Sequence, residues 1–94
     1  GAKLDAGKNR WDLLPLEVVE GVVKVMTFGA EKYTPNGWKE VPEAKDRYFS
    51  AMMRHLRAIQ RGEYLDPDSG LPHWMHFVTN AVFLGYFFNT EGKE

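Results

Sequence analysis

Residues 72–88, "PHWMHFVTNAVFLGYFF", contain the most apolar run of the chain and decide which folds are open to it. On a helix, one face of this segment is polar at its amino-terminal half and aromatic beyond, and its members are His73, His76, Asn80, Phe83 and Phe87. The other faces carry Trp, Met, Val and Leu side chains, so almost no face suits water. A helix that is apolar nearly all round has to be buried on several sides.

Two further helices are expected at about 15–33 and 44–61. Pro15 suits the first turn of the earlier helix. Each segment has a polar stripe at steps of three and four residues, namely Glu17, Glu20, Lys24, Thr27 and Glu31 in the first and Arg47, Ser50, Arg54, Arg57 and Arg61 in the second. The rest of the first helix is largely apolar, so it too is expected to be buried on several sides.

These patterns predict an all-α fold: one domain over residues 1–94, a bundle of three main helices. Three helices cannot easily cover that much apolar surface by themselves. We therefore expect dimerisation to complete the core, in a homodimer or a homotetramer.

Composition and charge narrow the function classes. Apolar residues make up 44% of the chain, which is typical of a packed domain. The formal net charge of −1 argues against nucleic-acid binding, because duplex binders usually carry a basic excess. There is no cysteine, which excludes disulfides and thiolate metal sites, and no apolar run is long enough for a membrane span. We expect a cytoplasmic protein without a membrane or nucleic-acid partner.

The histidines and the acidic loop before them form the first group of candidate functional residues. His73, His76 and Asn80 follow one another at single turns of the helix, and "GEYLDPDSGLP" precedes them. Imidazoles bind transition metals, but they also serve as hydrogen-bonded core groups. Asp66 is suited to a metal ligand and equally to capping a turn started by Pro67. Both readings stay open at this stage.

A second group is basic or aromatic. Arg54 adjoins His55, and Glu31 follows Gly29 and Ala30, small residues that permit close helix approach. Near the amino terminus, Lys8 and Arg10 could reach phosphate, although a frayed basic segment is the simpler reading.

Trp38 lies in the turn "PNGWK". It is either an anchor for that loop or a surface on which a base stacks.

The succession "DLLP", "TFGAEKY", "NGWKE", "MRHLRAIQRGE" and "DPDSGLPHWMHFVTNAVFL" resembles a phage-associated family of dATP/dGTP diphosphohydrolases. That family is an offshoot of the all-α, MazG-like and HisE-like nucleoside triphosphate pyrophosphohydrolases. The resemblance implies a hydrolase of nucleotide metabolism that cleaves dGTP and dATP to the monophosphate and pyrophosphate with Mg²⁺ or Mn²⁺, in the host cytoplasm if the protein is phage-encoded. His73 and His76 stand where the superfamily has metal-binding carboxylates, which implies a mixed site.

Such hydrolysis needs cations on the phosphates, basic groups and a positioned water, and the residues can be assigned by chemical type. The metal candidates are Glu31, Asp66, His73 and His76. The candidates for orienting water are Glu31, Glu63 and His55. The substrate-binding candidates are Lys8, Arg10, Lys32, Trp38, Arg54 and Asn80. The alternatives are a non-catalytic helical dimer that binds nucleotide or a partner protein and, less favoured, a zinc-dependent phosphohydrolase.

Overall fold

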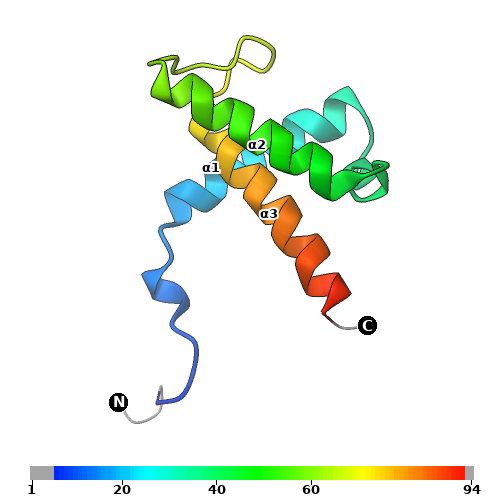
Figure 1. Cartoon of the computed structure of the whole chain (residues 1–94). Coiled ribbons are helices and arrows are strands. Elements are labelled where there is room, and N and C mark those ends of the chain that lie inside the picture. Colours follow the sequence, from blue (N-terminus) through cyan, green and yellow to red (C-terminus); the bar gives the residue numbers. More distant parts are fainter. Residues whose placement is uncertain (1–5, 93–94) are drawn as a thin grey trace.

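The computed structural model describes residues 6–92 and contains three α-helices, α1 (Leu16–Lys32), α2 (Ala44–Gln60) and α3 (His73–Glu91) (Figure 1). Short 3₁₀ turns, η2 (Trp11–Leu13) and η3 (Gly37–Glu40), lie in the connecting segments. Within residues 6–92, extended pairing is limited to the isolated bridge between Leu65 and Pro72. The all-α prediction and its three helices are confirmed, with α3 continuing beyond Phe88 to Glu91.

Helix α3 is the centre of the fold, since α1 and α2 both pack against it. Figure 1 shows α2 crossing α3, while the carboxyl-terminal part of α3 extends away from the crossing. Thr79, in the middle of α3, is fully buried, and its hydroxyl donates to the Met75 carbonyl oxygen at 2.7 Å. The buried apolar side chains are few: Val22, Val25, Ala44, Ala58 and Leu84.

Gly21 allows α1 to approach α3 closely. A Cβ at this position would lie 2.7 Å from Cη2 of Trp74 and 3.0 Å from Cγ of Met75, both on α3. At Gly29, where the sequence also permits a close approach, a Cβ would meet nothing within 4 Å in the described chain, so no helix of the same chain packs closely there. The two glycines of α1 therefore differ in their contact with α3: Gly21 packs directly against it, and Gly29 does not.

The loop between α1 and α2 is attached through Trp38. Its ring stacks on Phe83 of α3, with centroids 4.4 Å apart and planes inclined by 15°, and meets Tyr86 edge-on. The Tyr48 hydroxyl donates to the Trp38 carbonyl oxygen at 2.6 Å. Of the two readings of Trp38, this packing favours the anchor, because Phe83 covers one face of the ring and Tyr86 packs against it as well.

Large apolar side chains are exposed on all three helices of the single chain. The most prominent are Leu16 and Val23 on α1, Phe49 and Met53 on α2, and Val82 and Phe88 on α3, the last 60% exposed. The radius of gyration is 15.7 Å, whereas a compact chain of this length has about 12 Å. The single chain therefore lacks a closed core, as the apolar helix faces in the sequence indicated. Dimerisation, which we expect to complete the core, stays a prediction.

None of the helices between residues 6 and 92 combines the length and the hydropathy that crossing a membrane requires.

Candidate functional site

The site begins at the end of α2, where the chain reverses sharply. Gly62 has φ +83°, and its N–H donates to the Ile59 carbonyl oxygen. The N–H of Glu63 donates to the carbonyl oxygen of Ala58. This pair of bonds is a Schellman motif, which ends a helix with a residue in the left-handed region. Glu63 is thereby directed back toward α3.

The loop then folds over the first turn of α3. The His73 N–H donates to the Tyr64 carbonyl oxygen at 2.8 Å. The Asp66 N–H donates to the Leu71 carbonyl oxygen, also at 2.8 Å. Gly70, with φ +74°, closes the turn by donating to the Asp66 carbonyl oxygen. Backbone hydrogen bonds therefore place the acidic loop beside the histidines.

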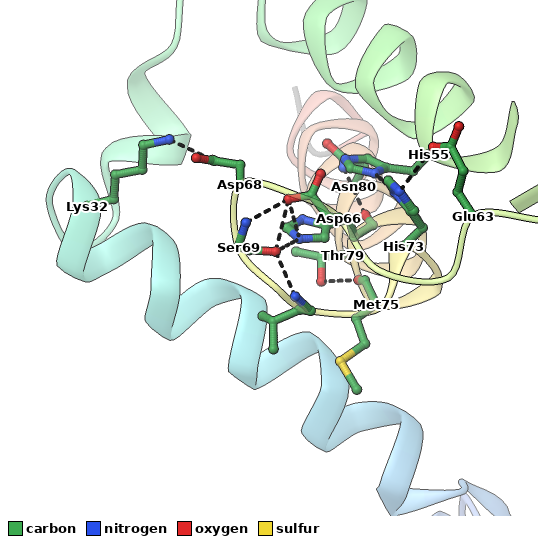
Figure 2. A network of polar contacts seen from close by, with 12 residues as sticks. Lys32, His55, Glu63, Asp66, Asp68, Ser69, His73, Met75, Thr79 and Asn80 are labelled. Carbon is green, nitrogen blue, oxygen red and sulfur yellow. Dashed lines mark hydrogen bonds and ion pairs between the residues drawn. The ribbon is translucent and has the colours of Figure 1, made fainter. Parts of the chain in front are cut away.

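Asp66 and Ser69 are the polar centre of this loop (Figure 2). Asp66 Oδ2 accepts hydrogen bonds from the Ser69 backbone N–H at 2.9 Å and from its hydroxyl at 3.0 Å. Burial works to raise the pKa of Asp66, but the bonds from Ser69 and the nearby histidines outweigh it and leave this pKa below its usual value. Asp66 is thus an ionised carboxylate in a preformed turn, as the capping prediction anticipated.

Three histidines from two helices meet next to Asp66. The Nδ1 atoms of His55 (α2) and His73 (α3) lie 2.9 Å apart, so one ring donates a hydrogen bond and the other accepts it. His76 stacks on His55, with centroids 4.6 Å apart and planes inclined by 12°. The Nε2 atom of His76 is 2.6 Å from the Ser69 hydroxyl oxygen and 3.7 Å from Asp66 Oδ2.

The surroundings keep His55 and His76 neutral. Burial is the main cause that lowers the pKa of His55 to about 4, and the nearby His76 adds to it. Burial also lowers the pKa of His76, although Asp66 opposes part of the shift. A neutral imidazole has a free nitrogen lone pair, which metal binding requires.

His73 is the most buried member, with 5% of its surface exposed. Its Nε2 is buried and has no hydrogen-bond partner in the described part of the chain. Glu63 Oε2 is 3.8 Å away, beyond hydrogen-bonding distance (Figure 2).

His55, Asp66 and His73 form a possible metal-binding group. Each offers one ligand atom, and these atoms lie within 4.8 Å of one another. The donor set fits a divalent metal that accepts nitrogen. It does not fit Mg²⁺ well, because Mg²⁺ prefers oxygen ligands and retained water.

A groove of about 700 Å³ is lined largely by residues of α2, and none of the three converging donors is among its lining residues. Among the residues that line it are Tyr33, Arg47, Tyr48, Arg54 and Asn80. Arg54 directly precedes His55, and the Asn80 side-chain amide donates to the His76 carbonyl oxygen at 2.8 Å. The two predicted substrate residues Arg54 and Asn80 thus line the same groove, and each is directly linked to a histidine along the chain or by a hydrogen bond.

A smaller groove, of about 340 Å³, runs along α1. Glu31 lines it together with Ser69 and Leu71. Glu31 is exposed and is not one of the three residues whose ligand atoms converge.

Three further residues predicted to bind phosphate, Lys8, Arg10 and Lys32, are not among the residues that line the larger groove. Lys32 Nζ donates to Asp68 Oδ2 at 2.7 Å, and this contact raises the pKa of Lys32. Arg10 forms two hydrogen bonds to Asp12, and Lys8 is exposed. Both lie in the amino-terminal segment, which extends away from α2 and α3 (Figure 1).

Sequence reasoning missed Ser69 and Arg47. Ser69 joins Asp66 to His76, and its place in the turn "DPDSG" was the available signal, since a capping Asp commonly accepts a hydrogen bond from the backbone N–H three residues later. Arg47 was included in a polar stripe, but only the packing of α2 on α3 shows that it lines the same groove as Arg54.

Comparisons with known proteins give a consistent result. The family model described as "dATP/dGTP diphosphohydrolase, N-terminal" matches residues 1–94. A dATP/dGTP diphosphohydrolase of Salmonella phage PMBT28 is 27% identical to this chain over 91 residues. The alignment covers 97% of this chain but 31% of the relative, so the chain spans about a third of that protein's length. No solved structure matches the chain.

Proposed function

Because this chain belongs to the family of dATP/dGTP diphosphohydrolase N-terminal domains, we propose that it hydrolyses purine deoxynucleoside triphosphates to the monophosphate and pyrophosphate. The single observation that carries this proposal is the connection between two features. A His and Asp group suited to a metal ion is connected to a groove that contains arginines and Asn80, because Arg54 directly precedes His55 and Asn80 donates to the His76 carbonyl oxygen. Triphosphate hydrolysis needs both, since the phosphates must be held and their charge neutralised.

The groove provides phosphate-binding and base-binding groups. Arg47 and Arg54 are planar cations that suit phosphate oxygens. The Asn80 side chain has both a donor and an acceptor, which is the chemistry needed to read a purine edge. We place the triphosphate against the arginines, with its α-phosphate toward the His and Asp group.

The water that attacks the α-phosphate needs a base near that group. Glu63 is the best placed of the predicted residues, because its carboxylate lies 3.8 Å from His73 and half of its side chain is exposed. His55 is one of the converging donors, so a metal-binding role suits it better than orienting water. A bound cation would contribute neutralisation of the triphosphate charge.

The test is a product assay of the purified chain with each dNTP and NTP, with Mg²⁺, Mn²⁺ or Zn²⁺ added. We expect pyrophosphate and the monophosphate from dGTP and dATP. An Arg54→Gln variant should raise KM more than it lowers kcat, because the guanidinium holds ground-state phosphate. Orthophosphate as the product would place cleavage at another bond, and no product with any nucleotide and metal would refute the proposal.

The alternative is a non-catalytic helical dimer that binds nucleotide or a partner protein. The observation in its favour is the apolar surface exposed on all three helices. A complex that binds dGTP at equilibrium but never releases product would select this alternative.

Both readings include self-association, and we propose a homodimer or a homotetramer. Large exposed apolar surface on a single chain is typical of interaction sites. Light scattering at micromolar concentration should give a mass of at least twice the 10.8 kDa of one chain. A monomeric mass would contradict this proposal.

A further inference from the structure

His73 has a buried ring nitrogen, Nε2, that has no hydrogen-bond partner among residues 6–92. A buried polar atom without a partner is unusual and calls for an explanation. An ion bound through Nδ1 of the same ring would fix the proton on Nε2, where it faces the Glu63 carboxylate. His73 is held firmly, because its backbone N–H donates to the Tyr64 carbonyl oxygen and its Nδ1 faces that of His55.

Two imidazoles and one carboxylate make up the converging donors, and they come from three different segments of the chain. His55 is on α2, Asp66 is in the loop and His73 begins α3. Ser69 holds the Asp66 carboxylate in place through two hydrogen bonds. The donors are therefore positioned before any ion arrives.

We propose that His55, Asp66 and His73 bind a transition-metal ion that accepts imidazole, such as Zn²⁺, Fe²⁺ or Co²⁺, in preference to Mg²⁺. This rests on the proposed function for the role of the site and deepens it by naming the class of metal. Imidazole is a good ligand for these ions, whereas Mg²⁺ prefers oxygen and gives up its water reluctantly. Mn²⁺ stands between the two classes, because it is the weakest binder of the divalent transition series.

The position of Glu63 also agrees with metal binding by His73. A histidine that binds a metal through Nδ1 carries its proton on Nε2, and metal-binding histidines commonly donate that N–H to a carboxylate. The unpartnered Nε2 of His73 has Glu63 Oε2 at 3.8 Å. A small movement of the exposed Glu63 side chain would complete that hydrogen bond.

The experiment is calorimetric titration of the full, chelator-treated chain with Zn²⁺, Co²⁺ and Mg²⁺ separately. We expect one Zn²⁺ per chain, bound at least about 100-fold more tightly than Mg²⁺. His55→Gln and His73→Gln should each weaken Zn²⁺ binding by at least about 100-fold, since even the loss of a supporting contact to a metal ligand costs 10- to 100-fold. Asp68→Asn is the matched control, because Asp68 is an acid of the same loop that pairs with Lys32 instead.

Circular dichroism without metal reports whether each variant is folded. His55 is only partly buried on α2, so its variant decides the question if the His73 variant does not fold. Equal affinity for Mg²⁺ and Zn²⁺, no metal binding at all, or full Zn²⁺ affinity in folded His55→Gln would overturn the proposal.

Turnover measured on the same samples separates the two proposals. Tight Zn²⁺ binding without hydrolysis under any condition would refute the hydrolase function and leave the metal site standing. Hydrolysis with Mg²⁺ in a chain that does not bind Zn²⁺ would refute the transition-metal site and leave the hydrolase function standing.

Discussion

Replacing Asp66 with asparagine should lower the rate of pyrophosphate release from dGTP by at least about 100-fold while leaving the chain folded. Asparagine keeps an oxygen that can accept the Ser69 N–H and hydroxyl, so the turn should persist. It loses the negative charge, and with it the only carboxylate among the three converging donors. A product assay at saturating metal, with circular dichroism of the same samples, measures both effects.

The control for this prediction is Asp68→Asn. The two acids are in the same loop, but Asp68 is exposed and pairs with Lys32, and its ligand atoms are not among those that converge. We expect turnover within about twofold of the original chain, since exposed ion pairs contribute little. Equal loss in both variants would show that loop charge matters and not the position of Asp66. Normal turnover in Asp66→Asn would remove Asp66 from the site.

Replacing Gly21 with valine should lower the free energy of unfolding by about 3 kcal/mol, the upper end of the usual cost of overpacking. Its Cβ would lie 2.7 Å from the Trp74 ring and 3.0 Å from Met75, and the two further methyl groups would add to the overlap. Relief would require α1 to move away from α3, and that contact is what holds α1 in the fold. Urea denaturation followed by circular dichroism, at a fixed protein concentration, measures the change.

Gly29→Val is the matched control for Gly21→Val. Both glycines are in α1, but a Cβ at Gly29 meets nothing within 4 Å in the described chain. Valine has a higher helix propensity than glycine, so we expect a stability equal to or slightly above that of the original chain. Similar destabilisation at both positions would mean that the effect comes from valine in the helix and not from the contact with Trp74.

The helices were predictable because their signals are local. Polar stripes at three- and four-residue steps marked α1 and α2, and Pro72 followed by an apolar segment marked α3. A turn at Asp66 was indicated by the Asp before Pro, with Ser and Gly after it, while a metal-binding role for Asp66 stayed equally open. The family resemblance read from the order of motifs agrees with the matching family model.

The site was predictable only in part. Asp66 and His73 were expected as metal ligands, and the structure brings them together. His55 was expected to orient water, but it lies among the converging donors. His76 and Glu31 were also expected as ligands, and these roles stay predictions: His76 contacts Ser69, Glu31 lines the groove along α1, and neither is among the three converging donors.

The sequence by itself determined the three helices, their faces and the capped turn, because each depends on residues within one or two turns of one another. The tertiary structure decided which of those faces meet. His55 and His73 are 18 residues apart and become neighbours only because α2 packs across α3. Gly21 and Gly29 are both in α1, and only the side chains of Trp74 and Met75, far away in the sequence, leave no room for a Cβ at Gly21. Periodicity specifies how a side chain points from its own helix, whereas the contact it makes depends on the sum of packing across the whole chain.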